Sequence, residues 1–357
     1  MKIRINELLV LLLFAKILVL IAVWIGMGDS TQIGDTQDYI SGKYIYRNDL
    51  LSTAYIMSVT GYFFNSITGS ALVSNIPLLI VSYIAVVYFL KKASMPFKYN
   101  AIILTLLCLS PNYLLWTSLH SKEAVFNTAA FFYLGLLVST QNSTDIRNSL
   151  KIIKSVLLLA CLLIMCFFKV AYTPILLFIH FMILYKKYFK NNMILILIML
   201  SFFLFLILIA LKMYISELDS IFSVMHLHFS GDGDNTRLDH KWNGLADMLS
   251  DLPIGVVVSF WGPTISELSD KFYSPIFFIE SFLWLCALIY FLSTSFNRFP
   301  KISLWLIILF AISIVGFIVV HYPFGYFNSG SALRYRQNFA PFLISLVAYF
   351  GYQSKKK

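Results

Sequence analysis

Long apolar runs dominate the chain, and the polar residues gather in the segments between them. About ten of these runs approach the length that a helix needs to cross roughly 30 Å of hydrocarbon. We expect membrane spans near residues 8–26, 72–90, 101–119, 124–139, 152–168, 172–185, 193–215, 276–295, 302–320 and 339–353. Several of these runs are short, so one span more or fewer is left open. The pattern predicts an all-α polytopic membrane protein, with residues 1–357 as a single transmembrane domain.

The composition agrees with a membrane protein. Hydrophobic residues make up 59% of the chain and charged residues 12%, whereas soluble domains average about 25% charged residues. The mean hydropathy is +0.80. The first apolar run has no small-x-small cleavage site and more spans follow it, so we interpret it as a retained span. The four cysteines lie in apolar runs without a CxxC pair, which disfavours a disulfide framework or a metal site.

The distribution of basic residues predicts the orientation. With the N-terminus inside, more than half of the 27 Lys and Arg residues fall in short inner loops, as the positive-inside rule requires. Both termini are then cytoplasmic. The net charge of +10 is explained by these loops, so we expect no nucleic-acid partner. The longest polar segments, residues 27–70 and 216–275, become large outward-facing loops, and the working face of the protein is predicted to be outside.

Two carboxylates follow the first span, within a few residues of the predicted membrane surface. Asp35 and Asp38 are candidates for a general base that acts on an acceptor hydroxyl, or for ligands of a divalent cation beside a diphosphate. The competing interpretation is a helix cap or an Asx-turn, because Gly34-Asp-Thr-Gln-Asp is typical of a helix start.

A second polar group lies in the outer turn between the third and fourth predicted spans. If the helix continues through this turn, Tyr113, Trp116, His120 and Glu123 share one face, since they are spaced three, four and three residues apart. Lys122 adds a cation beside Glu123. The alternatives are an ordinary interfacial aromatic belt and a surface ion pair.

Further cations follow on the predicted outer side. Lys169 lies in a turn too short to leave the membrane surface, so it either snorkels or binds an anionic group. In the long loop, Arg237, His240 and their neighbours mix acid, base and cation, with a solvated charge run as the competing interpretation. The preceding Gly231-Asp-Gly-Asp-Asn lacks the downstream glutamate of a calcium loop, and we interpret it as a flexible turn.

Arg334 and Arg336 form the last candidate group. An i, i+2 spacing places both side chains on one side only if the backbone is extended. Asn328-Ser-Gly-Ser favours such a non-helical approach, and Pro341 is expected at the start of the last span. A guanidinium carries a permanent charge and a donor fork that fits phosphate oxygens. The competing interpretation, an anchor at a helix end, is disfavoured on the outer side.

Three of these segments together resemble the bacterial O-antigen and capsular polysaccharide polymerases, integral-membrane glycosyltransferases with a GT-C-like architecture. The likeness lies in residues 111–123 with Trp116 and the Lys122-Glu123 pair, in residues 328–341 with both arginines, and in the acidic motif at residues 34–39. Two features depart from the family pattern: Lys169 replaces an arginine followed by proline, and Gln337-Asn338 replaces a more apolar pair.

The resemblance implies an activity at the periplasmic face of the bacterial inner membrane, namely the polymerisation of undecaprenyl-diphosphate-linked repeat units. Arg334, Arg336, Lys122 and Lys169 would bind the leaving diphosphate. The catalytic candidates, including the general base, are Asp35, Asp38, Glu123 and His240. No cofactor is expected apart from the divalent cation that carboxylates could hold. Expected partners are the lipid-linked glycan, the bilayer, a chain-length regulator and a flippase.

Three alternatives stay open at this point. A GT-C transferase that adds one sugar from a polyprenyl-monophosphate donor would use Asp35 equally well. A lipid-linked oligosaccharide flippase or transporter predicts charges deep inside spans and a pseudo-repeat; Lys16, Lys212 and Glu280 fall near spans, and no repeat is seen. A membrane acyltransferase would require a histidine-centred site, and the sequence offers no convincing one.

Overall fold

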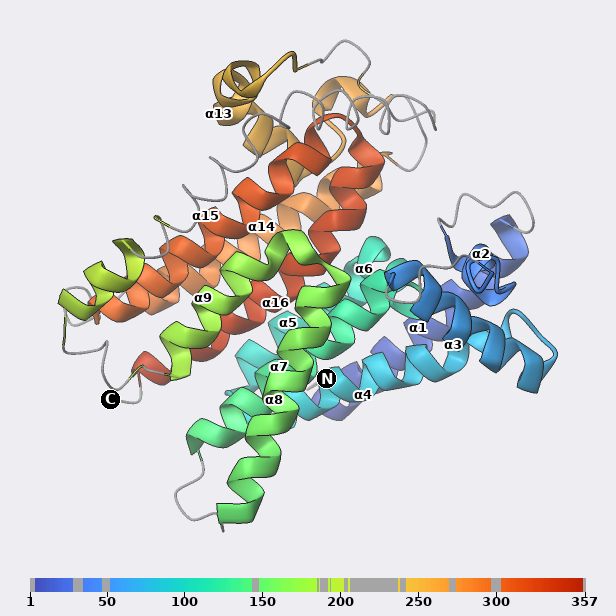
Figure 1. Cartoon of the computed structure of the whole chain (residues 1–357), viewed down its shortest axis with the longest axis horizontal. Coiled ribbons are helices and arrows are strands. Elements are labelled where there is room, and N and C mark those ends of the chain that lie inside the picture. Colours follow the sequence, from blue (N-terminus) through green and yellow to red (C-terminus); the bar gives the residue numbers. More distant parts are fainter. Residues whose placement is uncertain are drawn as a thin grey trace. The chain divides into compact units, whose positions relative to one another are not determined.

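The structure is a computed structural model and describes residues 4–27, 35–46, 52–142, 148–184, 186, 192, 194–201, 205, 237, 242–269, 274–296 and 303–355. Every regular element within these ranges is a helix, which confirms the predicted all-α class. In chain order (Figure 1) they are α1 Ile5–Met27, α2 Thr36–Ile40, α3 Thr53–Thr68, η2 Val73–Asn75, α4 Ile76–Ala93, α5 Phe97–Leu109, α6 Pro111–Ser118, α7 Lys122–Asn142, α8 Asn148–Phe168, η3 Val170–Tyr172, α9 Thr173–Leu184, α13 Leu245–Trp261, η4 Ile265–Glu267, α14 Ser274–Phe296, α15 Leu304–Tyr326 and α16 Ser329–Lys355.

Five of the described helical segments are long and apolar enough to cross a membrane, which is compatible with a membrane protein. They are Ile5–Gly26, Val73–Ala93, Lys122–Gln141, Ser274–Phe296 and Leu304–Tyr326. Two shorter apolar helices, Ile152–Phe168 and Val170–Leu184, coincide with predicted spans. Most of the predicted span 193–215 lies outside the described residues. The count of about ten spans, the GT-C-like architecture and the single transmembrane domain stay predictions.

The predicted span 101–119 is not one continuous helix. It consists of α5 and α6, which meet at an angle of 75°. The break falls at Ser110-Pro111, because proline lacks an N–H group and is tolerated in the first turn of a helix but not in its interior. The Ser110 side chain accepts a hydrogen bond from the Tyr113 N–H (3.1 Å) and so caps the start of α6.

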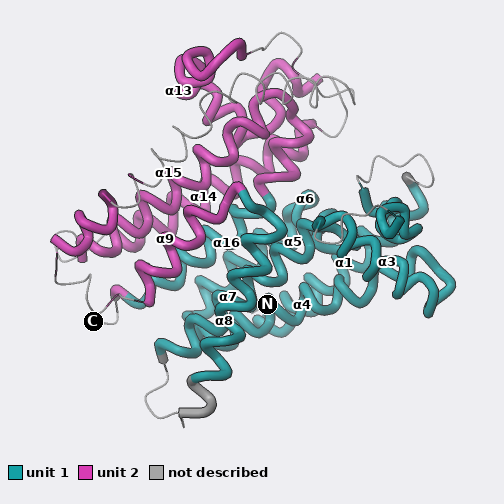
Figure 2. Tube along the Cα trace, in the orientation of Figure 1, with its two compact units in different colours: residues 1–170, 337–353 teal, residues 171–336, 354–357 magenta. Residues whose placement is uncertain are grey.

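The chain forms two compact units, drawn in different colours in Figure 2. Unit 1 comprises residues 1–170 and 337–353. Within it, α4 packs against α7, α7 packs against α8, and α1 packs against both α5 and α6. Its core is largely apolar, but it also encloses charged side chains, among them Lys16 in the middle of α1, which is fully buried.

Unit 2 comprises residues 171–336 and 354–357. Within it, α15 packs against α13 and α9. Trp242 lies in an aromatic cluster with Tyr322, Tyr326 and Phe327, and stacks on the Tyr326 ring at 5.1 Å. Helix α16 contributes residues to both units, since it begins at Ser329 and continues to Lys355.

Candidate functional site

In unit 1, the start of α7 carries a buried ion pair. Lys169 Nζ lies 2.9 Å from Glu123 Oε1, with the lysine side chain 11% exposed and the glutamate side chain 0% exposed. Glu123 stands in the first turn of α7, where the positive end of the helix dipole favours a carboxylate. Lys169 directly follows α8. The fold thus joins two predicted site residues that are 46 positions apart.

Asp35 and Lys122 both contact the side chain of Tyr39. The Tyr39 hydroxyl donates a hydrogen bond to Asp35 Oδ2 at 2.8 Å, and Lys122 Nζ lies 5.7 Å from the centre of the Tyr39 ring. The ring is buried, whereas Asp35 and Lys122 are both half-buried. Asp35 occupies the N-cap position of α2, as the capping interpretation predicted, but its side chain makes no capping hydrogen bond. Its carboxylate is directed to Tyr39 instead.

Asp38 contacts residues that are close to it in the chain, and its side chain is partly exposed. Its Oδ2 lies 2.7 Å from Lys43 Nζ and accepts a hydrogen bond from the Tyr44 hydroxyl at 3.2 Å. Burial, followed by the charges of Asp35 and Asp38, raises the pKa of the Tyr44 hydroxyl, so Tyr44 stays a neutral donor. Asp38 is therefore held by residues of its own loop.

His120 joins three segments of unit 1. Its Nε2 lies 2.9 Å from the Met57 carbonyl oxygen and 3.2 Å from Thr60 Oγ1, and its backbone N–H donates to Asn75 Oδ1 at 2.6 Å. Burial lowers the pKa of the imidazole, partly opposed by the bond to the Met57 carbonyl, so the ring is neutral at pH 7. His120 thus ties α3 and the start of α4 to the turn before α7.

The expected single helical face through this turn is wrong. Helix α6 ends at Ser118 and α7 begins at Lys122, so Tyr113 and Glu123 belong to different helices. Tyr113 instead lies beneath Lys16, whose Nζ is 5.4 Å from the ring centre. The spacing rule failed because it assumed a continuous helix, and the turn interrupts it.

The two arginines near the C-terminus lie within a helix and not on an extended segment. Helix α16 begins at Ser329 and runs through Pro341, so residues at i and i+2 diverge around its axis. The expected extended approach is therefore wrong. Asn328 Oδ1 accepts a hydrogen bond from the Ser331 N–H (2.9 Å), which stabilises the first turn of α16 where an extended chain was expected.

Arg336 is fully buried within unit 2. It donates to the carbonyl oxygens of Phe260 (3.0 Å) and Trp261 (3.2 Å), and to the Ser281 hydroxyl. Its Nη2 lies 3.7 Å from Glu280 Oε2. Arg334 is half-buried, so of the two it presents more surface to a ligand.

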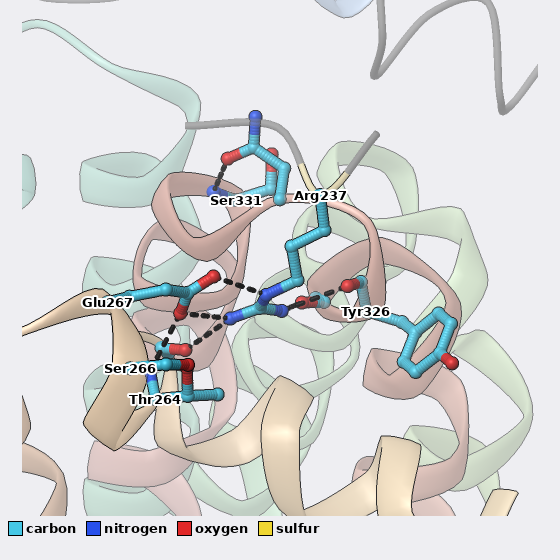
Figure 3. Close-up of polar contacts among 9 residues, drawn as sticks. Arg237, Thr264, Ser266, Glu267, Tyr326 and Ser331 are labelled. Atoms are coloured by element: carbon cyan, nitrogen blue, oxygen red, sulfur yellow. Dashed lines mark hydrogen bonds and ion pairs between the residues drawn. The ribbon is translucent and has the colours of Figure 1, made fainter. Parts of the chain in front are cut away.

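Arg237 is a structural residue of the long loop. Its guanidinium binds both carboxylate oxygens of Glu267, at 2.7 and 2.9 Å (Figure 3). It also donates to the carbonyl oxygens of Gly262, Gly325 and Tyr326. The interpretation of Arg237 as part of a solvated charge run is therefore wrong. Asp239, His240 and Lys241 lie outside the described residues, and so does Gly34.

The candidate site that the structure assembles is thus in unit 1, and it contains Asp35, Tyr39, Lys122, Glu123 and Lys169. Tyr39 was not among the predicted site residues, although its position four residues after Asp35 on a helix was a signal. Among the described residues, no group of three or more His, Cys, Asp or Glu side chains forms a metal-binding cluster. No family model, no curated protein and no solved structure matches the chain.

Proposed function

We propose that the chain is a membrane glycosyltransferase that polymerises polyprenyl-diphosphate-linked repeat units at the outer face of the bacterial inner membrane. One observation supports this proposal most. Unit 1 brings Asp35 and Lys122 to the same tyrosine, with the Glu123–Lys169 pair immediately beside Lys122 in the chain. Transfer from a lipid diphosphate requires a base for the acceptor hydroxyl and a cation for the leaving group.

The environments of the carboxylates distinguish their roles. Glu123 is completely buried and already neutralised by Lys169, so it is poorly placed to take a proton from a substrate. Asp38 is paired with Lys43. Asp35 is half-buried and accepts a hydrogen bond from the Tyr39 hydroxyl. In this proposal Asp35 is the base.

The transfer step follows from these roles. The acceptor oxygen forms a bond to the anomeric carbon of the donor sugar, and its proton passes to the Asp35 carboxylate. The bond between that carbon and the diphosphate oxygen breaks, and the electron pair leaves with the lipid diphosphate. Lys122 stabilises this developing negative charge, because a cation near a low-dielectric surface interacts strongly with a leaving phosphate. The Glu123–Lys169 pair fixes the start of α7, on which Lys122 stands.

The experiment uses a strain that lacks the gene and is complemented with variants, with its glycan chains resolved on a gel. We expect Asp35→Asn and Lys122→Gln to abolish the ladder at normal protein levels. Lys43→Gln is the matched control, since it removes a neighbouring cation that pairs outside the site, and its ladder should be unchanged. Full ladders from Asp35→Asn and Lys122→Gln would refute the proposal.

A second candidate, a transporter of lipid-linked oligosaccharides, is favoured by Lys16. This lysine is fully buried in the middle of the first span, and charges at such depth are typical of transport pathways. The deletion strain distinguishes the two functions. Loss of a polymerase leaves a single repeat unit on the acceptor, whereas loss of a transporter leaves no repeat unit and traps the lipid-linked unit on the cytoplasmic side.

A further inference from the structure

Helix α3 has no charged residue, although it lies between polar segments of the first outer loop. Its sixteen residues run from Thr53 to Thr68 and include Tyr, Phe and Ile side chains but no Asp, Glu, Lys or Arg. One face packs inward through Met57, Ser58 and Gly61. An ordinary water-facing helix would carry charges on the opposite face.

The opposite face of α3 is apolar and exposed. Val59, Phe63 and Ile67 follow one another at intervals of four residues, so they form one stripe. The exposed fractions of Phe63 and Ile67 are 56% and 66%, and Tyr62 beside them is 49% exposed. The exposed apolar series continues along the chain into Val73 and Ile76, where the next span begins.

Helix α3 is not among the described helices that are long and apolar enough to cross a membrane. Sixteen residues extend about 24 Å, which is less than the roughly 30 Å of a hydrocarbon core. Its midpoint is in contact with α2, and the two helices lie side by side (Figure 1). A Cβ atom at Gly61 would lie 2.8 Å from the Tyr39 carbonyl oxygen. Helix α2 and its following turn carry Asp38 and Lys43, whose side chains are 34% and 55% exposed.

From these observations we infer that α3 is an anchor that lies in the outer membrane–water interface, with Val59, Phe63 and Ile67 inserted among the lipids. A tyrosine at the rim of such a stripe matches the preference of aromatic side chains for the headgroup region. Because α3 contacts Tyr39 and His120 directly, the anchor holds both of them, and Asp35 with them, at headgroup depth.

Spin labels test this placement without reference to enzyme activity. Cys286 is the exposed native cysteine, so the background is Cys286→Ala. Single cysteines replace Phe63, Ile67 and, as the matched control in the same loop, Lys43. Each variant is labelled and reconstituted in phosphatidylethanolamine–phosphatidylglycerol vesicles. The collision rates of the attached spin label with oxygen and with a water-soluble nickel chelate are then measured.

We expect oxygen to collide several-fold more often than the nickel chelate at positions 63 and 67, with the reverse at position 43. Nickel-dominated collisions at all three positions would overturn the inference, and so would low collision rates with both reagents at 63 and 67, which indicate a protein partner. If labelled variants misfold, a lipid-soluble carbene reagent is applied to the wild-type chain. Labelling of the peptide around Phe63 then supports the anchor, and its absence refutes it.

Discussion

Removal of either partner of the Glu123–Lys169 pair is expected to destabilise the protein strongly. At 2.9 Å and an effective dielectric constant of about 20, the attraction amounts to roughly 6 kcal/mol. Most of it offsets the desolvation of two buried charges, so the net contribution of the pair is small. The loss of one partner leaves the other charge buried without compensation and costs about 3–5 kcal/mol.

A double-mutant cycle measures this effect. Glu123→Gln, Lys169→Met and the double variant are unfolded with dodecyl sulfate in mixed micelles and followed by tryptophan fluorescence. Each single variant should lose about 3 kcal/mol or more, and the double variant should lose clearly less than their sum. The control is Lys43→Met, which breaks an exposed pair and should cost about 0–1 kcal/mol. Additive losses below about 1 kcal/mol would refute the burial argument.

Three further predictions concern other contacts. Lys16→Met should lower the thermal midpoint by several degrees, because three neutral oxygens would lose their ammonium donor; an unchanged midpoint contradicts this. Gly61→Ala should also lower the midpoint, since its Cβ would overlap the Tyr39 carbonyl, and equal stability would show that the contact can relax. The stability difference between the wild type and Glu267→Gln should depend on pH. Burial raises the pKa of Glu267, but the bonds from Arg237 and from the Thr264 backbone lower it more, and the net pKa is below 4.5. The difference is therefore fully present above pH 4.5 and is lost as the pH falls through the folded-state pKa; a flat profile between pH 3 and 7 opposes this.

The apolar pattern predicted much of the secondary structure because hydrophobic length is a local property. The runs at 8–26, 276–295 and 302–320 each coincide with a long apolar helix. The same pattern missed the break at Ser110-Pro111. The apolar residues continue on both sides of Pro111, so hydrophobicity alone did not show that this proline begins a second helix. It also placed the start of the last span at Pro341, whereas α16 begins twelve residues earlier and contains that proline.

The charged members of the candidate site were predictable, but Tyr39 and the pairing of the residues were not. Lys122, Glu123, Lys169 and Asp35 stood out because each is a charge at the end of an apolar run. The pairing of Lys169 with Glu123, and the contact of Lys122 with the ring of Tyr39, depend on segments that are distant in the chain. Local spacing contains no information on such contacts, which is why it suggested the wrong neighbours for Tyr113.

Three buried cations share a role that the sequence did not suggest. Lys16 donates to the Thr117 carbonyl in the last turn of α6. Arg336 donates to the two last carbonyl groups of α13. Arg237 donates to the two last carbonyl groups of α15. The last four carbonyl groups of a helix have no partner within it, and they form the negative end of its dipole.

This shared role changes how the cations on the predicted outer side should be interpreted. The orientation rule disfavours cations there as membrane anchors, and a ligand for substrate phosphate was the natural alternative. Capping of helix C-termini is a third function, and it satisfies a buried charge and buried carbonyl groups at the same time. Arg336 is used in this way and is fully enclosed, so loss of glycan chains in Arg336→Ala would be expected from misfolding alone. Arg334→Ala is the informative variant for a phosphate clamp, because Arg334 is half-buried and its removal leaves the α13 cap intact. A full ladder from Arg334→Ala would leave Lys122 as the cation of the proposed diphosphate site.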